Sequence, residues 1–396
     1  MINSIVSLSA ARLIASLMQA AAFVSLARQV PVSEFGITNT LLAIGALAMV
    51  VADLGLGTFL LRAHSLKDPR TRGALLLNAH STLTVGLAGT GIVYVLSRSG
   101  DSALAALSLL PIAIAMEKNF DTSSSVAIAD GRTRLVGAGI VLRRALTLSA
   151  VLAAMTIGFN PLLSFCGGYL AGSIAAQLVL RFSRVIPESS LRPQWRLEYE
   201  ALRASGSYLA SNVSAQARQL DIPIAQLTVG GYGAGLYAGA SRLVTPFSMI
   251  AVSAANVILP RLTKAKEVRA RRLAVQMGFA LAVMVVASVP ASLLAPWVVV
   301  ILFGDSYADA GAAAILLVLA LPFVSMATPM GAALQAIGLE RAVAVNGMSF
   351  AAVFVAAAIL MSLTWGIAGV AAATLVAYIG KCVALLAMMK KRGGSA

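Results

Sequence analysis

Eleven ionisable side chains lie within long apolar stretches of this sequence, where a charge costs several kcal/mol unless it pairs or faces water. The cations are Arg12, Lys118, Arg143, Arg144, Arg218, Arg242 and Lys381, and the acids are Asp53, Glu117, Asp121 and Asp221. Seven cations against four acids leave an excess of three positive charges. Because a guanidinium group binds phosphate oxygens through two parallel hydrogen bonds, this excess predicts an anionic, phosphate-bearing ligand.

The depth of each charged residue in the membrane can be calculated at about 1.5 Å of rise per residue along untilted helices. These depths predict two ion pairs. Measured from the same side, Arg12 lies at about 10 Å and Asp53 at about 12 Å, whereas Asp221 and Arg242 both lie at about 26 Å. We therefore predict an Arg12–Asp53 pair and an Asp221–Arg242 pair. Each pair is compatible with two roles, a structural contact that holds two helices together and a part of a functional site.

Asp121 lies at nearly the same depth as the adjacent residues Arg143 and Arg144, at about 10–13 Å. Neighbouring residues of a helix point about 100° apart, so only one of these arginines is expected to reach Asp121. The other arginine, together with Arg218 and Lys381, has no partner at its own depth. For these residues we favour a wet cavity and an anionic ligand, with snorkelling towards the lipid headgroups as the alternative.

All seven cations are thus predicted to bind substrate. Asp53, Glu117 and Asp221 are candidate carboxylates for coupling to an H⁺ or Na⁺ gradient, although the predicted pairs would occupy two of them. Catalytic residues, a metal site and a cofactor site are not predicted, because the sequence has no paired-acid motif in an outer loop and no metal-ligand cluster. We therefore do not expect an enzyme.

Twelve segments must position these charges, since crossing a bilayer takes about 20 mostly apolar residues. They are residues 5–27, 37–61, 74–97, 103–128, 135–158, 160–181, 204–228, 234–260, 273–303, 310–337, 341–363 and 367–389. The composition agrees, with 59% hydrophobic residues, 11% charged residues and a mean hydropathy of +0.88. Such values predict an all-α integral membrane protein.

Basic residues are concentrated in the loops on one side of these segments. Of the 30 lysines and arginines, 21 lie in those loops, against two in the loops of the other side. The positive-inside rule places the basic loops in the cytoplasm and, with an even number of spans, both termini as well. The net charge of +15 would suggest nucleic acid as the partner of a soluble chain, but this distribution argues against it. We expect a multi-pass protein of the inner membrane, surrounded by lipid.

The chain divides into an N-terminal half, residues 1–181, a cytoplasmic interfacial linker, residues 182–203, and a C-terminal half, residues 204–396. Gly36 to Arg62 and Gly235 to Arg261 are both 26 residues apart, each over the second helix of its half, which indicates an internal repeat. Six helices per half give two parallel halves. Transporters with such repeats hold cargo between the halves and alternate its access to the two sides.

The linker contains an amphipathic pattern. Trp195, Tyr199 and Leu202 recur at helical spacing and are interleaved with Arg196 and Arg203. We predict an interfacial helix, with its aromatic residues at headgroup depth and its arginines near anionic lipid. A solvated linker is the alternative.

Several short motifs occur along nearly the whole chain in a recognisable order. They are LARQVPVSEFG at 26–36, DLGLGT at 53–58, Arg62, Asp221, Gly230, Gly233, GLYA at 235–238, ASRL at 240–243, PRL at 260–262, FGDSYADA at 303–310 and GIAGVA at 366–371. In this order they resemble the bacterial polysaccharide (O-antigen, Wzx-type) flippases.

That resemblance implies the twelve-helix fold shared with the multidrug and toxin extruders (MATE) and the lipid II flippase. It also implies a cargo, an oligosaccharide on undecaprenyl pyrophosphate, moved from the cytoplasmic to the periplasmic leaflet of the bacterial inner membrane. The excess of intramembrane cations suits the pyrophosphate. Partners implied by the family are this lipid-linked oligosaccharide, membrane lipids and other glycan-assembly proteins.

Other functions of the same fold remain open. A MATE-type multidrug or cation antiporter predicts an acid-rich lumen, whereas this chain is cation-rich. A lipid II-type flippase shares the cargo chemistry. The sequence lacks the motifs of a membrane glycosyltransferase. A scaffold protein that transports nothing stays compatible with the sequence.

Overall fold

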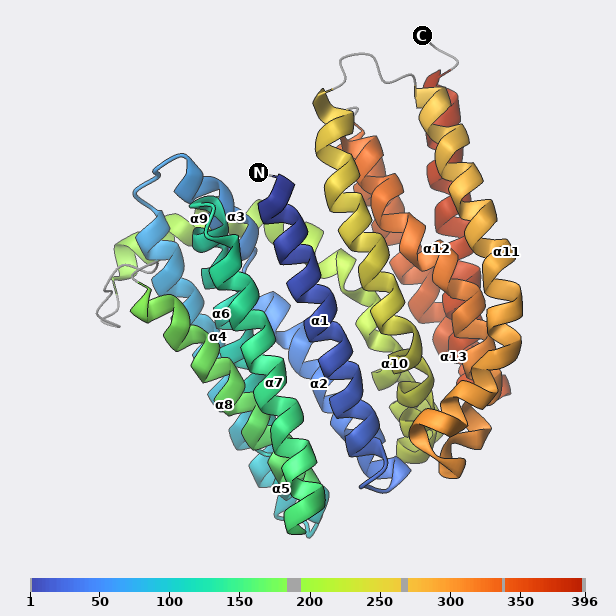
Figure 1. The fold of residues 1–396 in the computed structure, drawn as a ribbon. Helices are drawn as coiled ribbons and strands as arrows, with labels where there is room; N and C mark the ends of the chain where they lie inside the picture. Colours follow the sequence, from blue (N-terminus) through green and yellow to red (C-terminus); the bar gives the residue numbers. More distant parts are fainter. Residues whose placement is uncertain (1, 184–193, 265–269, 337–338, 394–396) are drawn as a thin grey trace. The chain divides into compact units, whose positions relative to one another are not determined.

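The computed structural model describes four stretches of the chain: residues 2–183, 194–264, 270–336 and 339–393. Every regular element in these stretches is a helix (Figure 1). The chain forms two compact units. Unit 1 consists of Met1–Val30 and Thr38–Gln219, and unit 2 consists of Pro31–Ile37 and Leu220–Ala396. Residues 184–193 of the predicted linker lie outside the described residues.

The helices of unit 1 begin and end at local sequence signals. They are α1 (Ile2–Ala27), α2 (Val32–Ala52, whose first turn and a half belong to unit 2), α3 (Leu56–Ser65), α4 (Thr71–Ser97), α5 (Ser102–Ala106), α6 (Leu110–Ala129), α7 (Thr133–Ile157), α8 (Pro161–Phe182), α9 (Trp195–Ala215) and the 3₁₀ helix η1 (Ala217–Leu220). The Asp101 carboxylate accepts hydrogen bonds from two backbone N–H groups at the start of α5. The Asn160 side chain caps α8 in the same way, ahead of Pro161.

Unit 2 contains two long helices that are broken at glycines. Its elements are α10 (Asp221–Lys264), α11 (Ala270–Phe303), the 3₁₀ helix η2 (Asp305–Ala310), α12 (Gly311–Ala336) and α13 (Glu340–Gly393). Gly230 (φ 84°, ψ 180°) interrupts α10, and Gly366 (φ 57°, ψ −137°) interrupts α13. Both glycines have a positive φ, which residues with a side chain adopt only at a cost, so each one marks the junction between two predicted spans.

Nine helices in the described stretches are long and apolar enough to cross a membrane, and the last of them, Arg341–Lys391, is divided in two at Gly366. Three predicted spans are divided in the structure. In 103–128, α5 ends at Ala106 and α6 begins at Leu110. In 37–61, α2 ends at Ala52 and α3 begins at Leu56, with positive φ at Leu54 and Gly55. In 204–228, α9 ends and η1 intervenes before α10 begins.

The first turns of α2 pack against α10 within unit 2 through glycines. A Cβ on Gly36 would lie 2.2 Å from the Gly231 carbonyl oxygen, and a Cβ on Gly235 would lie 1.9 Å from the Val32 carbonyl oxygen. Because these contacts involve backbone atoms, only glycine allows such an approach. Beside them, the Phe35 ring lies 6.0 Å from the Tyr307 ring in an edge-on arrangement.

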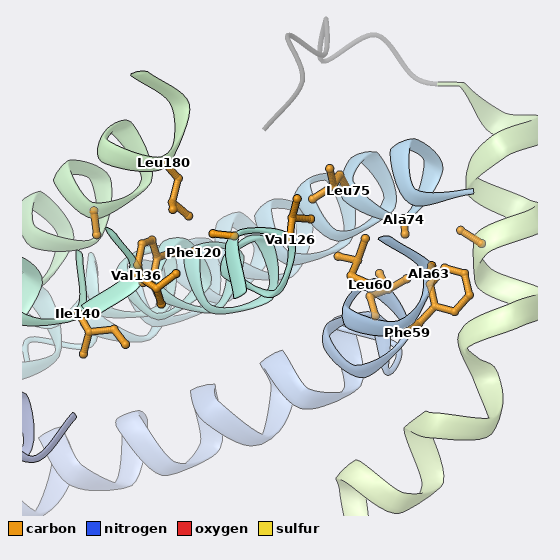
Figure 2. Close-up of a cluster of buried hydrophobic side chains, with 14 of the residues drawn as sticks. Phe59, Leu60, Ala63, Ala74, Leu75, Phe120, Val126, Val136, Ile140 and Leu180 are labelled. Atoms are coloured by element: carbon orange, nitrogen blue, oxygen red, sulfur yellow. The ribbon is translucent and has the colours of Figure 1, made fainter. Parts of the chain in front are cut away.

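An apolar core joins α1, α3, α4, α6, α7, α8 and α9 at the end of unit 1 that carries the basic loops. Figure 2 shows Phe59 and Leu60 of α3 near Leu75 of α4 and Val126 of α6. Phe120 of α6 is fully buried in the same core. This residue also contacts the charged side chains described below, so the core and the charges adjoin.

Acids neutralise part of the basic end of unit 1. Both histidines of the chain face carboxylates there: His64 Nε2 lies 2.8 Å from Asp130 Oδ1, and His80 Nδ1 lies 3.1 Å from Glu198 Oε2. In the loop before α4, Asp68 accepts a 2.6 Å hydrogen bond from Arg70. That hydrogen bond lowers the pKa of the Asp68 carboxyl below its ordinary value.

Candidate functional site

Three helices of unit 1 bring together what we call the acid–arginine cluster. Its members are Glu117 and Asp121 on α6, Arg143 and Arg144 on α7, and Tyr169 on α8. Small residues let these helices approach closely. A Cβ on Gly172 of α8 would lie 2.5 Å from the Arg143 carbonyl oxygen, so α8 rests directly on the backbone of α7.

Glu117 is the centre of the cluster. Its Oε1 lies 2.5 Å from Arg144 Nη2 and 3.1 Å from Arg143 Nη2, and its Oε2 accepts a hydrogen bond from the Tyr169 hydroxyl. Arg143 Nη1 also donates to Asp121 Oδ1 at 2.7 Å. Charge-assisted hydrogen bonds of this kind are strongest when water is excluded, and both arginines are buried.

Aromatic rings cover both guanidinium groups. The Arg143 guanidinium carbon lies 5.3 Å from the centre of the Phe120 ring, and that of Arg144 lies 5.2 Å from the centre of the Tyr169 ring. Such cation–π contacts stabilise a desolvated cation by about 2 kcal/mol. The arginines are therefore held on several sides by the protein itself.

A second ion pair lies at the break between α2 and α3. Asp53 Oδ2 lies 3.3 Å from Lys118 Nζ, and Asp53 Oδ1 accepts a 2.5 Å hydrogen bond from Thr122 Oγ1. Asp53 is almost fully buried, and it stands just before the N-terminus of α3, where the helix dipole favours a negative charge.

These contacts correct two predictions. Asp53 binds Lys118, whereas Arg12 is exposed, so the predicted Arg12–Asp53 pair is wrong. Both Arg143 and Arg144 bind carboxylates, so the expectation that one of them lacks a partner is also wrong. The physical reason is that rise along a helix gives depth, whereas the direction of a side chain depends on how the helix is rotated in its bundle.

Sequence reasoning missed the role of Glu117, although a signal was present. Glu117 and Asp121 are four residues apart, which places two carboxylates on one face of a helix opposite two adjacent arginines. Phe120, Thr122 and Tyr169 had no such signal, because their part in the site depends on tertiary packing.

The charges of unit 1 described so far balance. Lys118, Arg143 and Arg144 face Asp53, Glu117 and Asp121, three cations against three acids. The excess of three positive charges therefore belongs to the remaining ionisable residues of the predicted spans. These are Arg12, Arg218, Arg242 and Lys381, with Asp221 as the acid.

The structure places these remaining residues in different elements. Arg218 is half-buried on η1, and Lys381 is half-buried on α13 with its Nζ 5.4 Å from the centre of the Tyr378 ring. Asp221 begins α10, and its Oδ2 accepts a 3.2 Å hydrogen bond from the Tyr237 hydroxyl. Arg242 is half-buried on the same helix, and its pairing with Asp221 stays a prediction.

The cluster and the Asp53–Lys118 pair thus form a charge-neutral network that joins α6, α7, α8 and the break between α2 and α3, and within it Arg143 Nε is buried without a hydrogen-bond partner. In the described stretches, no group of three His, Cys, Asp or Glu side chains is arranged to hold a metal ion. The surplus positive charges that are available to an anionic ligand therefore lie outside this network.

Comparison with known proteins identifies relatives of the chain. The family described as "Polysaccharide biosynthesis protein" matches residues 1–266. Comparison with curated protein sequences gave no match.

Solved structures share the fold over nearly the whole chain. A lipid II flippase, MurJ, in an inward closed conformation has a TM-score of 0.77 and 15% identity, and the match covers 97% of this chain and 87% of that one. An inward-facing multidrug resistance MATE family transporter of the MOP superfamily has a TM-score of 0.75 and 16% identity, with coverage of 96% and 95%. These matches confirm the predicted fold class.

The description of a third similar structure concerns the polarity of its binding pocket. This structure is that of a MOP superfamily transporter from Pyrococcus furiosus, with a TM-score of 0.67, 17% identity and coverage of 99% and 96%. The reversed polarity of its binding pocket is described as suggesting a different function. At such low identity the likeness shows the fold alone.

Proposed function

This chain belongs to the polysaccharide biosynthesis protein family, and from that premise we propose that it is a flippase for an oligosaccharide carried on undecaprenyl pyrophosphate. It moves this cargo from the cytoplasmic to the periplasmic leaflet of the bacterial inner membrane by alternating access. Both termini lie in the cytoplasm, as the charge of the loops favours. The protein is a transporter and not an enzyme.

The observation that carries this proposal is the surplus of three intramembrane positive charges outside the neutral network. A pyrophosphate group carries negative charge on oxygens that arginine binds bidentately, and low dielectric strengthens the contact. A drug or cation exporter needs the opposite sign. A hydrated passage also spares the sugar hydroxyls the cost of crossing hydrocarbon without hydrogen bonds.

Arg218 is our first choice for a pyrophosphate ligand. It lies on η1, in the break between α9 and α10. Broken helices mark substrate sites in several transporter folds. Arg12, Arg242 and Lys381 supply the other cations of the proposed passage. Lys118, Arg143 and Arg144 were predicted to bind substrate as well, and that role remains a prediction.

Replacing Arg218 with Ala is expected to lower glycan export about tenfold or more, because losing a hydrogen bond to a charged group costs about 1.5–3 kcal/mol. The measurement is surface glycan in bacteria that lack their own flippase, at equal membrane levels of a fluorescent fusion protein. Arg98→Ala is the matched control, since Arg98 is exposed in a predicted outer loop. Full export by Arg218→Ala would refute the role of Arg218 in cargo binding.

Two alternatives share the fold. A MATE-type multidrug or cation antiporter predicts that expression protects a drug-sensitive host, which growth assays measure directly. A lipid II-type flippase predicts rescue of cells depleted of their own lipid II flippase. In the proposed flippase, an H⁺ or Na⁺ gradient supplies the energy, with Asp53, Glu117 and Asp221 as candidate coupling carboxylates. Membrane lipids and other glycan-assembly proteins are its proposed partners.

A further inference from the structure

One face of helix α9 packs tightly against the rest of unit 1. A Cβ on Gly73 of α4 would lie 2.3 Å from the Leu197 carbonyl oxygen, so the two backbones touch. Glu198 is buried, faces His80 of α4 and accepts a 2.9 Å hydrogen bond from the Gln194 backbone N–H. Ala201 is fully buried in the apolar core. This packed face fixes the rotation of α9 about its own axis.

The direction of α9 differs from that of its neighbours in unit 1. Both figures show α9 crossing the ends of α3 and α4 instead of running along them (Figures 1 and 2). The other long helices of unit 1 are candidate membrane spans. A helix that lies across the basic ends of such spans lies close to the plane of the membrane surface.

The two remaining faces of α9 differ in chemistry. Trp195, Tyr199 and Leu202 form an apolar strip, and the Trp195 and Tyr199 residues are 77% and 65% exposed. Arg196, Glu200 and Arg203 form a charged strip. At about 100° per residue, the packed face, the apolar strip and the charged strip each occupy about a third of the helix circumference. An interfacial helix directs its apolar residues towards hydrocarbon and its charged residues towards water.

From this geometry we infer that the apolar and charged strips of α9 together bind the anionic phospholipid headgroups of the cytoplasmic leaflet. Tryptophan and tyrosine rings settle at the headgroup level, where an apolar body and a polar edge are both accommodated. Arg196 Nε lies 3.3 Å from Glu200 Oε1, so the two arginines and one glutamate of the charged strip leave a net charge of +1. Each net positive charge close to the surface adds attraction to anionic lipid, about fivefold in affinity. This binding is independent of the cargo.

Fluorescence quenching of Trp195 tests the inference. The chain has three tryptophans, so W297F/W365F leaves Trp195 as the single reporter in vesicles of phosphatidylcholine and phosphatidylglycerol. Lipids brominated near the headgroup should quench Trp195 strongly, and brominated phosphatidylglycerol should quench it more than brominated phosphatidylcholine. R196Q/R203Q in the same background should reduce that preference at least fivefold.

A protein that retains only Trp297 is the matched control. Trp297 is 75% exposed on α11, far along the chain from the arginines of α9, so R196Q/R203Q should leave its quenching unchanged. If the double tryptophan variant does not fold, the quenching difference between wild type and W195F reports the same signal. Quenching of Trp195 by aqueous iodide but not by brominated lipid would overturn the inference. So would an anionic preference that survives R196Q/R203Q.

Discussion

Replacing Glu117 with Gln is expected to destabilise the protein by about 3–5 kcal/mol, because it leaves two buried guanidinium groups without their shared carboxylate. Arg143 keeps its ion pair with Asp121, whereas Arg144 loses its carboxylate partner and keeps its contacts with Tyr169. Glutamine has nearly the same shape as glutamate, so this substitution tests the effect of the negative charge alone. Thermal unfolding in detergent, followed by size-exclusion chromatography of a fluorescent fusion, measures the loss.

Asp121→Asn is the matched control on the same helix face. The Asp121 side chain is 44% exposed and shares Arg143 with Glu117, so its replacement should cost no more than about 1 kcal/mol. Removing Arg144 together with Glu117 should recover part of the loss, since the partner left unpaired is then gone. Equal destabilisation by Glu117→Gln and Asp121→Asn would show that the cluster is not organised around Glu117.

Gly235→Ala is expected to separate the start of α2 from α10 and to destabilise unit 2 by about 1–3 kcal/mol or more. The new Cβ would meet the Val32 carbonyl oxygen at 1.9 Å, and a backbone atom cannot turn aside as a flexible side chain can. Gly36→Ala should act in the same way, through the Gly231 carbonyl oxygen. The unfolding temperature in detergent measures both effects.

Gly278→Ala on α11 is the control for this pair. Nothing lies within 4 Å of the position that its Cβ would occupy, and alanine favours a helix over glycine, so the variant should be neutral or slightly more stable. Wild-type unfolding temperatures for both Gly36→Ala and Gly235→Ala would show that the close approach of α2 and α10 is not needed for folding.

The neutral network changes the meaning of the charge surplus. The sequence counts of seven cations and four acids were correct, but the expectation that Arg143 or Arg144 would contribute a free charge was not. Satisfied buried charges serve packing and specificity more readily than ligand binding. Arg218, in the break before α10, is therefore a better candidate for binding an anionic ligand than the arginines of α7.

Several features followed from the sequence because they depend on local windows of residues. Spans such as α8 and α12 need only about 20 apolar residues, and the charge surplus is a sum over positions. The junctions at Gly230 and Gly366 fell between predicted spans, and the helix that carries Trp195 followed from spacing alone.

Tertiary structure alone decided which charges meet. Asp53 pairs with Lys118 and not with Arg12, and Glu117 gathers two arginines, because glycines such as Gly172 set how closely the helices approach and how each one is rotated. The breaks after Ala52 and before Asp221 lie inside single predicted spans, so only the structure reveals them. Depth along a helix can be calculated from residue number, but the direction of a side chain depends on neighbours that are distant in the chain.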